Sequence, residues 1–166
     1  MKKLIWPFVA VFLFIGAVGY YSRGSLTIPT KTKEVLPAKD ESVVVISGKI
    51  VMVEVADNSV TRAKGLGGRE SLGEERGMLF IFNDENVSPP FWMKDMRIAI
   101  DIIWINDGKV SQITKNVQPP PEGATTADLE LHLPDDPIDY VLEVNAGYSD
   151  ANEIKVGDTI DLSSTL

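Results

Sequence analysis

The chain has 166 residues, of which 44% are hydrophobic and 24% are charged, and this composition is typical of one folded domain rather than of a disordered chain. Its formal net charge of -8 argues against a nucleic-acid partner, because binding to phosphate backbones requires a basic surface. The chain contains no cysteine and a single histidine, His132, which excludes a disulfide framework, a cysteine nucleophile and a histidine-rich metal site. We therefore expect neither a metal nor a cofactor.

The amino-terminal segment, residues 1–21, has the pattern of a membrane anchor. Residues 4–21 carry no formal charge and follow Lys2 and Lys3. A bilayer core of about 30 Å needs roughly 20 such residues in a helix, so this segment is long enough to cross it. We expect one transmembrane helix, with the carboxyl-terminal domain outside the cytoplasm. The alternative is a secretory signal peptide cleaved after Gly19, which would release a secreted protein.

Residues 22–42 are predicted to be a flexible tether, because they contain two prolines, several Thr and Lys residues and few large apolar side chains. The folded body is expected to cover residues 43–166. Residues 22–166 contain 14 basic and 24 acidic residues. Anionic lipid headgroups would repel such a body, so we expect it to stand away from the membrane surface.

Short β-branched runs between turn residues predict a series of strands in the body, over residues 43–46, 50–55, 77–82, 91–94, 98–105, 110–117 and 140–144. Residues 154–160 are expected to form a turn and a final strand. Ser47-Gly48 and Asp107-Gly108 are typical of tight hairpin turns. Two short helices are expected, one over residues 60–64 behind the cap residue Asn58 and one within residues 147–152. The pattern predicts a mainly β fold, either a small sandwich or a partly open barrel, with two short helices.

A long irregular stretch, residues 118–138, contains five prolines and the single histidine. Loops of this length are uncommon in compact domains and tend to be functional or disordered. We expect His132 to be a surface or packing residue rather than a catalytic base, and the sequence leaves the role of the stretch open.

The first candidate site is a cluster of basic residues around the glycines of residues 65–68. Its members are Arg62, Lys64, Arg69 and Arg76. Glycine backbones allow close approach of a ligand and arginine side chains match carboxylate or phosphate groups, so the cluster could bind an anion. The alternative is that a helix cap and internal salt bridges explain the same residues.

The second candidate site combines Trp92 and Lys94 with Asp101. On a strand, aromatic side chains beside alternating charges could line a concave ligand pocket. Asp101 lies inside an apolar strand and would need a partner there, for which we expect Arg69 first, Lys94 second and Arg97 third. A buried structural ion pair would explain Asp101 equally well.

Glu143 is a second carboxylate within an apolar strand, and burial could raise the pKa of both Asp101 and Glu143. If the two carboxyl groups faced one cleft about 5–10 Å apart, they could serve as the carboxylate pair of a hydrolase.

Seven short motifs between about residues 51 and 162 carry a family resemblance, namely Arg62–Leu66, Arg69–Leu72, Gly77–Phe82, Phe91–Lys94, Ile100–Ile102, Tyr140–Gly147 and Ile154–Asp158. Together they resemble domain-of-unknown-function family 192. The resemblance implies a small, mainly β domain that often follows a signal peptide or membrane anchor. It implies no reaction, because the family has none assigned.

The sequence departs from the family pattern at several positions. Gly67 stands where the family often has Met, Asp95 where it often has Asn, and Ala99 where it often has Pro. The region of residues 119–121 lacks the cysteine that many relatives have. A site that depends on that cysteine or on the amide is therefore not expected here.

Three functions remain open at this point. The first is a membrane-tethered binding or accessory domain outside the cytoplasm, which holds an anionic or carbohydrate-like ligand or a protein partner. The second is a hydrolase, and the third is a purely structural domain. No catalytic residue can be assigned, and the candidate ligand-binding residues are Arg62, Arg69, Trp92, Lys94, Asp101 and Glu143.

Overall fold

The computed structural model describes residues 42–82 and 87–165. The predicted transmembrane segment of residues 4–21 and nearly all of the predicted tether lie outside these residues. In the two described ranges, no helix has both the length and the apolar composition needed to cross a membrane.

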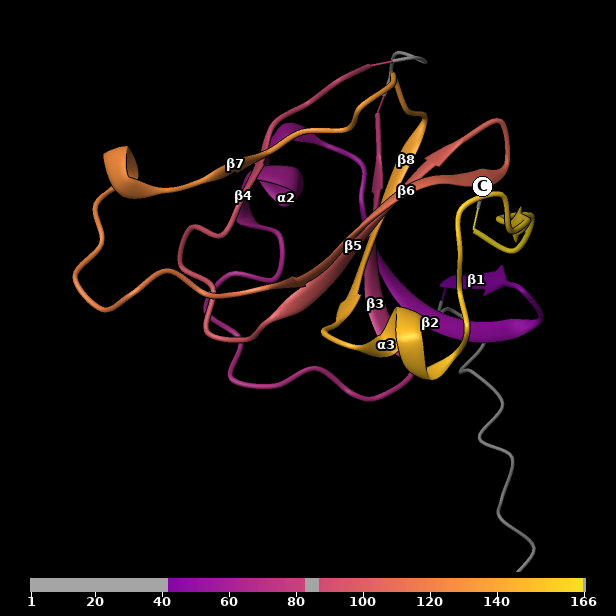
Figure 1. Ribbon diagram of the computed structural model, residues 1–166, viewed down its shortest axis with the longest axis horizontal. Helices are drawn as coiled ribbons and strands as arrows, with labels where there is room; N and C mark the ends of the chain where they lie inside the picture. Colours follow the sequence, from indigo (N-terminus) through magenta and orange to yellow (C-terminus); the bar gives the residue numbers. More distant parts are fainter. Residues whose placement is uncertain (1–41, 83–86, 166) are drawn as a thin grey trace, which may run out of the picture. The chain divides into compact units, whose positions relative to one another are not determined.

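A mixed seven-stranded sheet forms the centre of the domain, with the strand order β6-β5-β8-β3-β2-β1-β9 (Figure 1). Neighbouring strands are antiparallel except for β2 and β3, which are parallel and are connected through helix α2 (Ser59–Lys64). The strands are β1 (Ser42–Ile46), β2 (Lys49–Ala56), β3 (Arg76–Ile81), β5 (Ile100–Asn106), β6 (Lys109–Val117), β8 (Tyr140–Asn145) and β9 (Ile160–Asp161).

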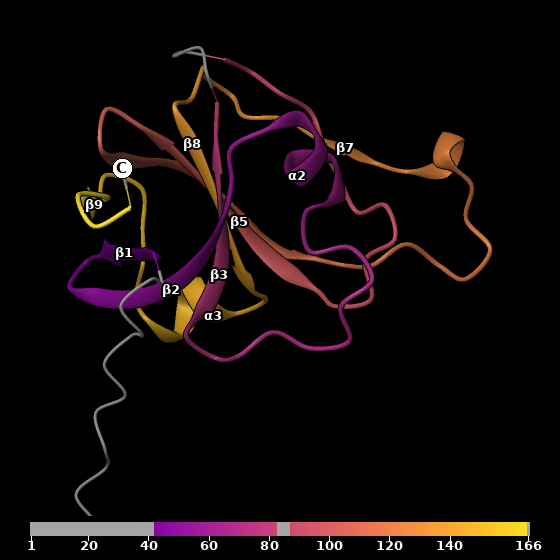
Figure 2. The same ribbon diagram turned by 180° about the vertical axis from the view of Figure 1, so that it is seen from behind.

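The sheet curls so that its two ends approach each other, as the views from opposite sides show (Figures 1 and 2). Backbone hydrogen bonds connect the ends, since the Val110 N–H donates to the Asp158 carbonyl at 2.9 Å and the Ile160 N–H donates to the Gly108 carbonyl at 2.9 Å. The mainly β prediction is confirmed, and the curled half-barrel corresponds to the expected partly open barrel rather than to the sandwich.

Each face of the central strands carries its own hydrophobic core, because successive side chains of a strand point to opposite faces. Along β5, Ile103 and Ile105 belong to the core shared with β1, β9 and α3 (Tyr148–Ala151), whereas Ile102 and Trp104 belong to the core shared with β4 (Phe91–Trp92). The prediction that this strand is buried on both faces is confirmed.

Two predicted strands are shorter than expected. β4 is limited to Phe91–Trp92 and pairs with β7 (Leu131–His132) in a separate two-stranded ribbon. The final strand, β9, covers only Ile160–Asp161 and follows a turn at residues 156–157. The irregular stretch of residues 118–138 includes β7 and the short 3₁₀ helix η1 (Thr126–Asp128), and part of it projects away from the sheet (Figure 2).

Helix α2 begins where the sequence predicts. The Asn58 side chain accepts from the Val60 N–H at 3.1 Å and the Thr61 N–H at 3.0 Å, and the Asn58 N–H donates to the Thr61 hydroxyl oxygen at 3.2 Å. The helix ends at Gly65, whose φ of 49° favours glycine. This short helix brings its basic last turn against one face of the sheet, where the candidate site lies.

Candidate functional site

A pocket of about 230 Å³ opens on the face of the sheet that α2 and β4 cover. Residues from α2, from β3, from β8 and from the segment around β4 contribute to it. Its lining combines aromatic rings, prolines, three basic side chains and one acid, namely Arg62, Ala63, Lys64, Gly65, Leu66, Phe80, Phe82, Pro89, Pro90, Phe91, Trp92, Lys94, Met96 and Glu143.

Interlocking aromatic rings build one wall of the pocket. The Phe91 ring packs edge-on against Phe80, Phe82 and Trp104, with centroid separations of 5.0, 6.5 and 5.4 Å. Such edge-to-face contacts favour one arrangement of the rings. Trp92, the next residue, is 45% exposed and offers an open aromatic surface at the same pocket.

Glu143 is the one acid in the described lining and is the most unusual residue of the site. It lies on β8 opposite Met78 and Ile102, and it is only 6% exposed. Its Oε2 atom is buried and has no hydrogen-bond partner among the residues that the structure describes. Burial raises the pKa of this carboxyl to about 8, because the charged form loses its hydration. At neutral pH the site therefore holds a mostly protonated carboxyl group.

Basic side chains line the same pocket. Arg62 and Lys64 come from the last turn of α2, and Lys94 follows β4. Arg62 is held in place, since its Nη1 donates to the Ile81 carbonyl at 2.7 Å and its guanidinium carbon lies 5.4 Å from the centre of the Phe82 ring. Lys64 and Lys94 are exposed. The pocket thus has a buried acid and an exposed basic mouth.

Four of the six predicted ligand-binding residues line this pocket, namely Arg62, Trp92, Lys94 and Glu143. The fold brings the helical end of the first cluster together with the aromatic segment of the second. The sequence places these segments about 30 residues apart, and their meeting depends on the β2–α2–β3 crossover and on the position of β4.

Arg69 lies outside the lining and forms an internal salt bridge. Its two terminal nitrogens donate to the two carboxylate oxygens of Glu54 at 2.5 and 2.7 Å. These hydrogen bonds lower the pKa of Glu54 and raise that of Arg69. For Arg69, the alternative of an internal salt bridge is therefore the one that the structure supports.

The predicted cationic partner of Asp101 is wrong. The side chain is fully buried, but backbone amides satisfy it. Its Oδ1 accepts from the Asn116 N–H at 2.9 Å and the Gly147 N–H at 3.1 Å, and its Oδ2 accepts from the Ser149 N–H at 3.0 Å. Arg69 pairs with Glu54 instead. A carboxylate that accepts several N–H groups is stabilised in its charged form without a basic side chain.

The predicted carboxylate pair is also wrong, for a geometric reason. Asp101 lies opposite Val144, and Glu143 lies opposite Ile102, so the two acids stand at adjacent positions of neighbouring strands. Because side chains alternate between faces, Asp101 points toward the core of Val144 and Glu143 toward the core of Ile102. The two carboxyl groups therefore cannot act on one substrate in one cleft.

Several lining residues were not predicted from the sequence. Met78 and Phe80 on β3, and Phe82 just after it, are spaced two residues apart and share one hydrophobic core, a relation that the period of two could have shown. Gly77 supports the same region, because a Cβ atom there would lie 2.6 Å from the Glu143 carbonyl oxygen. The sequence carries no signal that Pro89 and Pro90 would cover this particular face.

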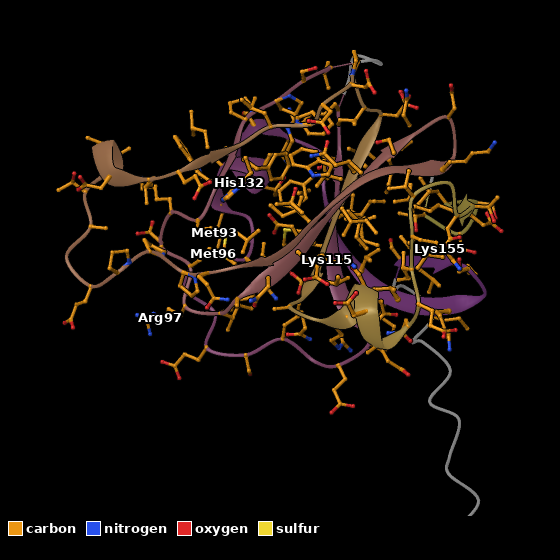
Figure 3. The ribbon with its side chains drawn as sticks, viewed as in Figure 1. Met93, Met96, Arg97, Lys115, His132 and Lys155 are labelled. Atoms are coloured by element: carbon orange, nitrogen blue, oxygen red, sulfur yellow. The ribbon has the colours of Figure 1, made fainter. Side chains whose placement is uncertain are left out.

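A larger depression of about 530 Å³ lies along the proline-rich stretch and is lined in part by Met93, Lys115 and His132. Figure 3 shows Met93, Met96 and His132 on the side of the central strands that carries β4 and β7. Within the two described ranges, none of the buried side-chain atoms that lack a hydrogen-bond partner belongs to the lining of this depression. The pocket at Glu143 is therefore the stronger candidate.

The curled sheet and its lateral pocket define a small, mainly β domain with a candidate ligand site on one face of the sheet. The chain belongs to the DUF192 family of uncharacterized ACR proteins, whose model matches residues 42–162. No curated protein matches it.

Two solved structures are similar to the chain. A protein of unknown function from Novosphingobium aromaticivorans is 32% identical, with a TM-score of 0.64, over 72% of this chain and 83% of that one. A protein from Sinorhizobium meliloti, described as a proposed transcription regulator, is 27% identical, with a TM-score of 0.65, over 79% of this chain and 98% of that one. The match therefore covers nearly all of the second protein.

Proposed function

We propose that this protein is a membrane-tethered binding domain outside the cytoplasm, and that the pocket at Glu143 holds a small anionic or carbohydrate-like ligand. The observation that carries the proposal is the buried Oε2 atom of Glu143, which lines the pocket and has no hydrogen-bond partner in the described part of the chain. An unsatisfied buried polar group costs about 1–3 kcal/mol. A ligand that bonds to Oε2 would remove this cost.

The other lining residues support a ligand of this kind. Trp92 and the wall around Phe91 offer aromatic surfaces against which a ring can pack. Arg62, Lys64 and Lys94 concentrate positive charge at one place on an acidic chain, which favours an anionic group at the mouth.

The membrane tether in this proposal is inferred from the sequence alone. Residues 4–21 are long and apolar enough for a single membrane span, and residues 22–42 have tether composition. The family match begins at residue 42, where this tether would end. Cleavage after Gly19 is the alternative, and it would give a secreted binding domain.

An accessory role with a protein partner is the second candidate function. Trp92 and Leu131 are paired across the β4–β7 ribbon and are 45% and 52% exposed, and Leu133 nearby is 54% exposed. Exposed apolar side chains in one place are typical of interaction surfaces. The acidic net charge argues against direct nucleic-acid contact, whatever the role of the protein from Sinorhizobium meliloti.

A thermal-shift screen against anions, sugars and cell-wall fragments tests the proposal. We expect at least one compound to raise the melting temperature of the wild-type protein, and we expect Glu143→Leu, which removes the polar atoms, and Trp92→Ala to reduce that shift. Arg69→Met is the matched control, because Arg69 is a basic residue near the pocket that pairs with Glu54 outside the lining. Equal shifts in all four proteins would argue against the pocket as the ligand site.

A further inference from the structure

The polarity of the pocket suggests what kind of ligand it selects. We propose that the ligand is a single-ring compound with a hydroxyl group at one end and an anionic group at the opposite end. The hydroxyl group would bond to Glu143, and the anionic group would lie between Lys64 and Lys94. This inference rests on the proposed function and deepens it, since it assigns a chemical class to the same site.

The size of the pocket limits the ligand to about one ring. Its volume of about 230 Å³ lies below the roughly 300–1,000 Å³ that is usual for pockets that hold drug-sized molecules. The wall is aromatic, since Phe91 packs edge-on against Phe80 at 5.0 Å. Either a flat aromatic ring or the apolar face of a sugar ring can lie against such a surface, so both belong to the class.

The hydroxyl end of the ligand follows from Glu143. Its carboxyl group is 6% exposed, and its Oε2 atom has no hydrogen-bond partner among residues 42–82 and 87–165. A hydroxyl group can both donate and accept a hydrogen bond. It therefore suits this carboxyl group whether or not the group is protonated. An anionic group at the same place would be repelled whenever Glu143 loses its proton.

The anionic end follows from the charges at the mouth. Lys64 on α2 and Lys94 after β4 are exposed, whereas Glu143 on β8 is buried, so the positive charges and the acid lie at different depths. Arg62 adds a third positive charge on α2. Glu143 is the one acid among the described lining residues, so the mouth favours a negative group.

Two probes represent the class, 4-hydroxybenzoate for aromatic sources and D-glucuronate for sugar sources. Their matched partners are benzoate and phenol, which lack the hydroxyl and the carboxylate respectively, and D-glucose, which lacks the carboxylate. The full chain in lipid nanodiscs would be titrated with each compound by calorimetry, with empty nanodiscs as the blank. We expect at least one probe to bind about tenfold more tightly than its partners, as one hydrogen bond or ion pair of about 1.4 kcal/mol requires.

Variants then assign each end of the ligand. Glu143→Leu removes both oxygen atoms that could bond to the hydroxyl group and should weaken the better probe severalfold, while benzoate binding stays unchanged. Lys94→Met should weaken the binding of all three carboxylates, 4-hydroxybenzoate, D-glucuronate and benzoate, and leave that of phenol unchanged. Arg97→Met is the matched control, because Arg97 pairs with Glu70 and does not line the pocket. Circular dichroism of each variant confirms that it is folded.

The outcomes separate this inference from the proposed function. If neither probe binds, or if benzoate binds as tightly as 4-hydroxybenzoate and glucose as tightly as glucuronate, the two-ended ligand is wrong. The pocket then remains a ligand site only if the thermal-shift screen finds another compound whose effect depends on Glu143 and Trp92. If a probe binds but Glu143→Leu and Lys94→Met leave its affinity unchanged, it binds elsewhere, and the inference is wrong as well.

Discussion

Glu143 is an acid whose protonation is coupled to folding. In the unfolded chain its pKa is near 4.5, and in the folded protein burial raises it to about 8. Between these two pH values the folded state binds more protons than the unfolded state, so the stability of the protein falls as the pH rises. Above about pH 8 both states are ionised, and this contribution no longer changes.

Glu143→Gln removes this dependence, because glutamine does not titrate. We expect the free energy of unfolding of the wild-type protein, relative to Glu143→Gln, to fall by on the order of 3–5 kcal/mol between pH 5 and pH 9. Denaturant titrations of residues 42–166 at pH 5, 7 and 9 measure this difference in the free energy of unfolding. Acids with lowered pKa values, such as Glu54, are present in both proteins and cancel in the difference. Parallel stability curves for the two proteins would show that Glu143 is not buried as described.

The Asp101 carboxylate accepts three backbone N–H groups from two segments. One of these N–H groups belongs to Asn116 at a bulge of β6, where the left-handed φ of 54° is costly for most residues. The other two belong to Gly147 and Ser149 at the start of α3. Asp101→Ala leaves these amides without acceptors, so we expect it to lower the free energy of unfolding by about 3–5 kcal/mol. Asp101→Asn keeps one acceptor oxygen and should cost less. Denaturant titration measures both.

A double-mutant cycle separates these amide contacts from an ion pair. Arg69 binds Glu54 at a partly exposed position, so Arg69→Met should cost no more than about 1 kcal/mol. Its effect should add to that of Asp101→Ala, because the two residues share no partner. A coupling energy well above 0.5 kcal/mol would instead support the ion pair expected from the sequence.

At the scale of elements, local signals predicted the fold well. Asn58 marked the start of α2, Ser47-Gly48 and Asp107-Gly108 marked hairpin turns, and β-branched runs marked the long strands. Each of these signals depends on interactions within a few residues. The ribbon of β4 and β7 could not be predicted, because its partners lie about 40 residues apart and only two residues of each strand pair.

The candidate site, too, could be predicted from the sequence only in part. Trp92, Lys94, Arg62 and Glu143 stood out by residue type, and the structure brings them together. The error at Asp101 arose because the sequence displays charged side chains as possible partners but does not show which backbone amides a fold will direct at a buried acid.

The capping box of α2 positions the basic residues at the mouth of the pocket. Asn58→Ala removes the acceptor for the Val60 and Thr61 N–H groups, so we expect it to lower the free energy of unfolding by about 1 kcal/mol. Asn58→Ser keeps a capping oxygen and should lower the free energy of unfolding by only a few tenths of the loss expected for Asn58→Ala. Thermal unfolding of residues 42–166 measures both variants. Equal losses for alanine and serine would show that the cap contributes little.

At the scale of the whole molecule, the domain is expected to be independent of the amino-terminal segment. Residues 42–166 carry two hydrophobic cores and the complete curled sheet, and the similar protein from Sinorhizobium meliloti consists almost entirely of this domain. We expect residues 42–166 to be soluble, mainly β by circular dichroism, and to unfold in a single cooperative transition. A helix-dominated spectrum or two separate transitions would contradict this expectation.

The amino-terminal segment should determine where the protein is found. Residues 4–21 carry no charged side chain and follow Lys2 and Lys3, a layout that favours the amino end in the cytoplasm and the domain outside. We expect the full chain to fractionate with membranes. We also expect protease added to spheroplasts, whose cytoplasmic membrane is intact, to digest the domain. Replacement of Phe12 and Leu13 with arginine should abolish membrane association, because a charged side chain in the middle of a span costs about 2.5–3.5 kcal/mol. Sequencing of the mature amino end tests the alternative, since a chain that starts at Tyr20 would be a secreted protein. Full-length protein recovered from the cytoplasm would contradict both the anchor and the signal peptide.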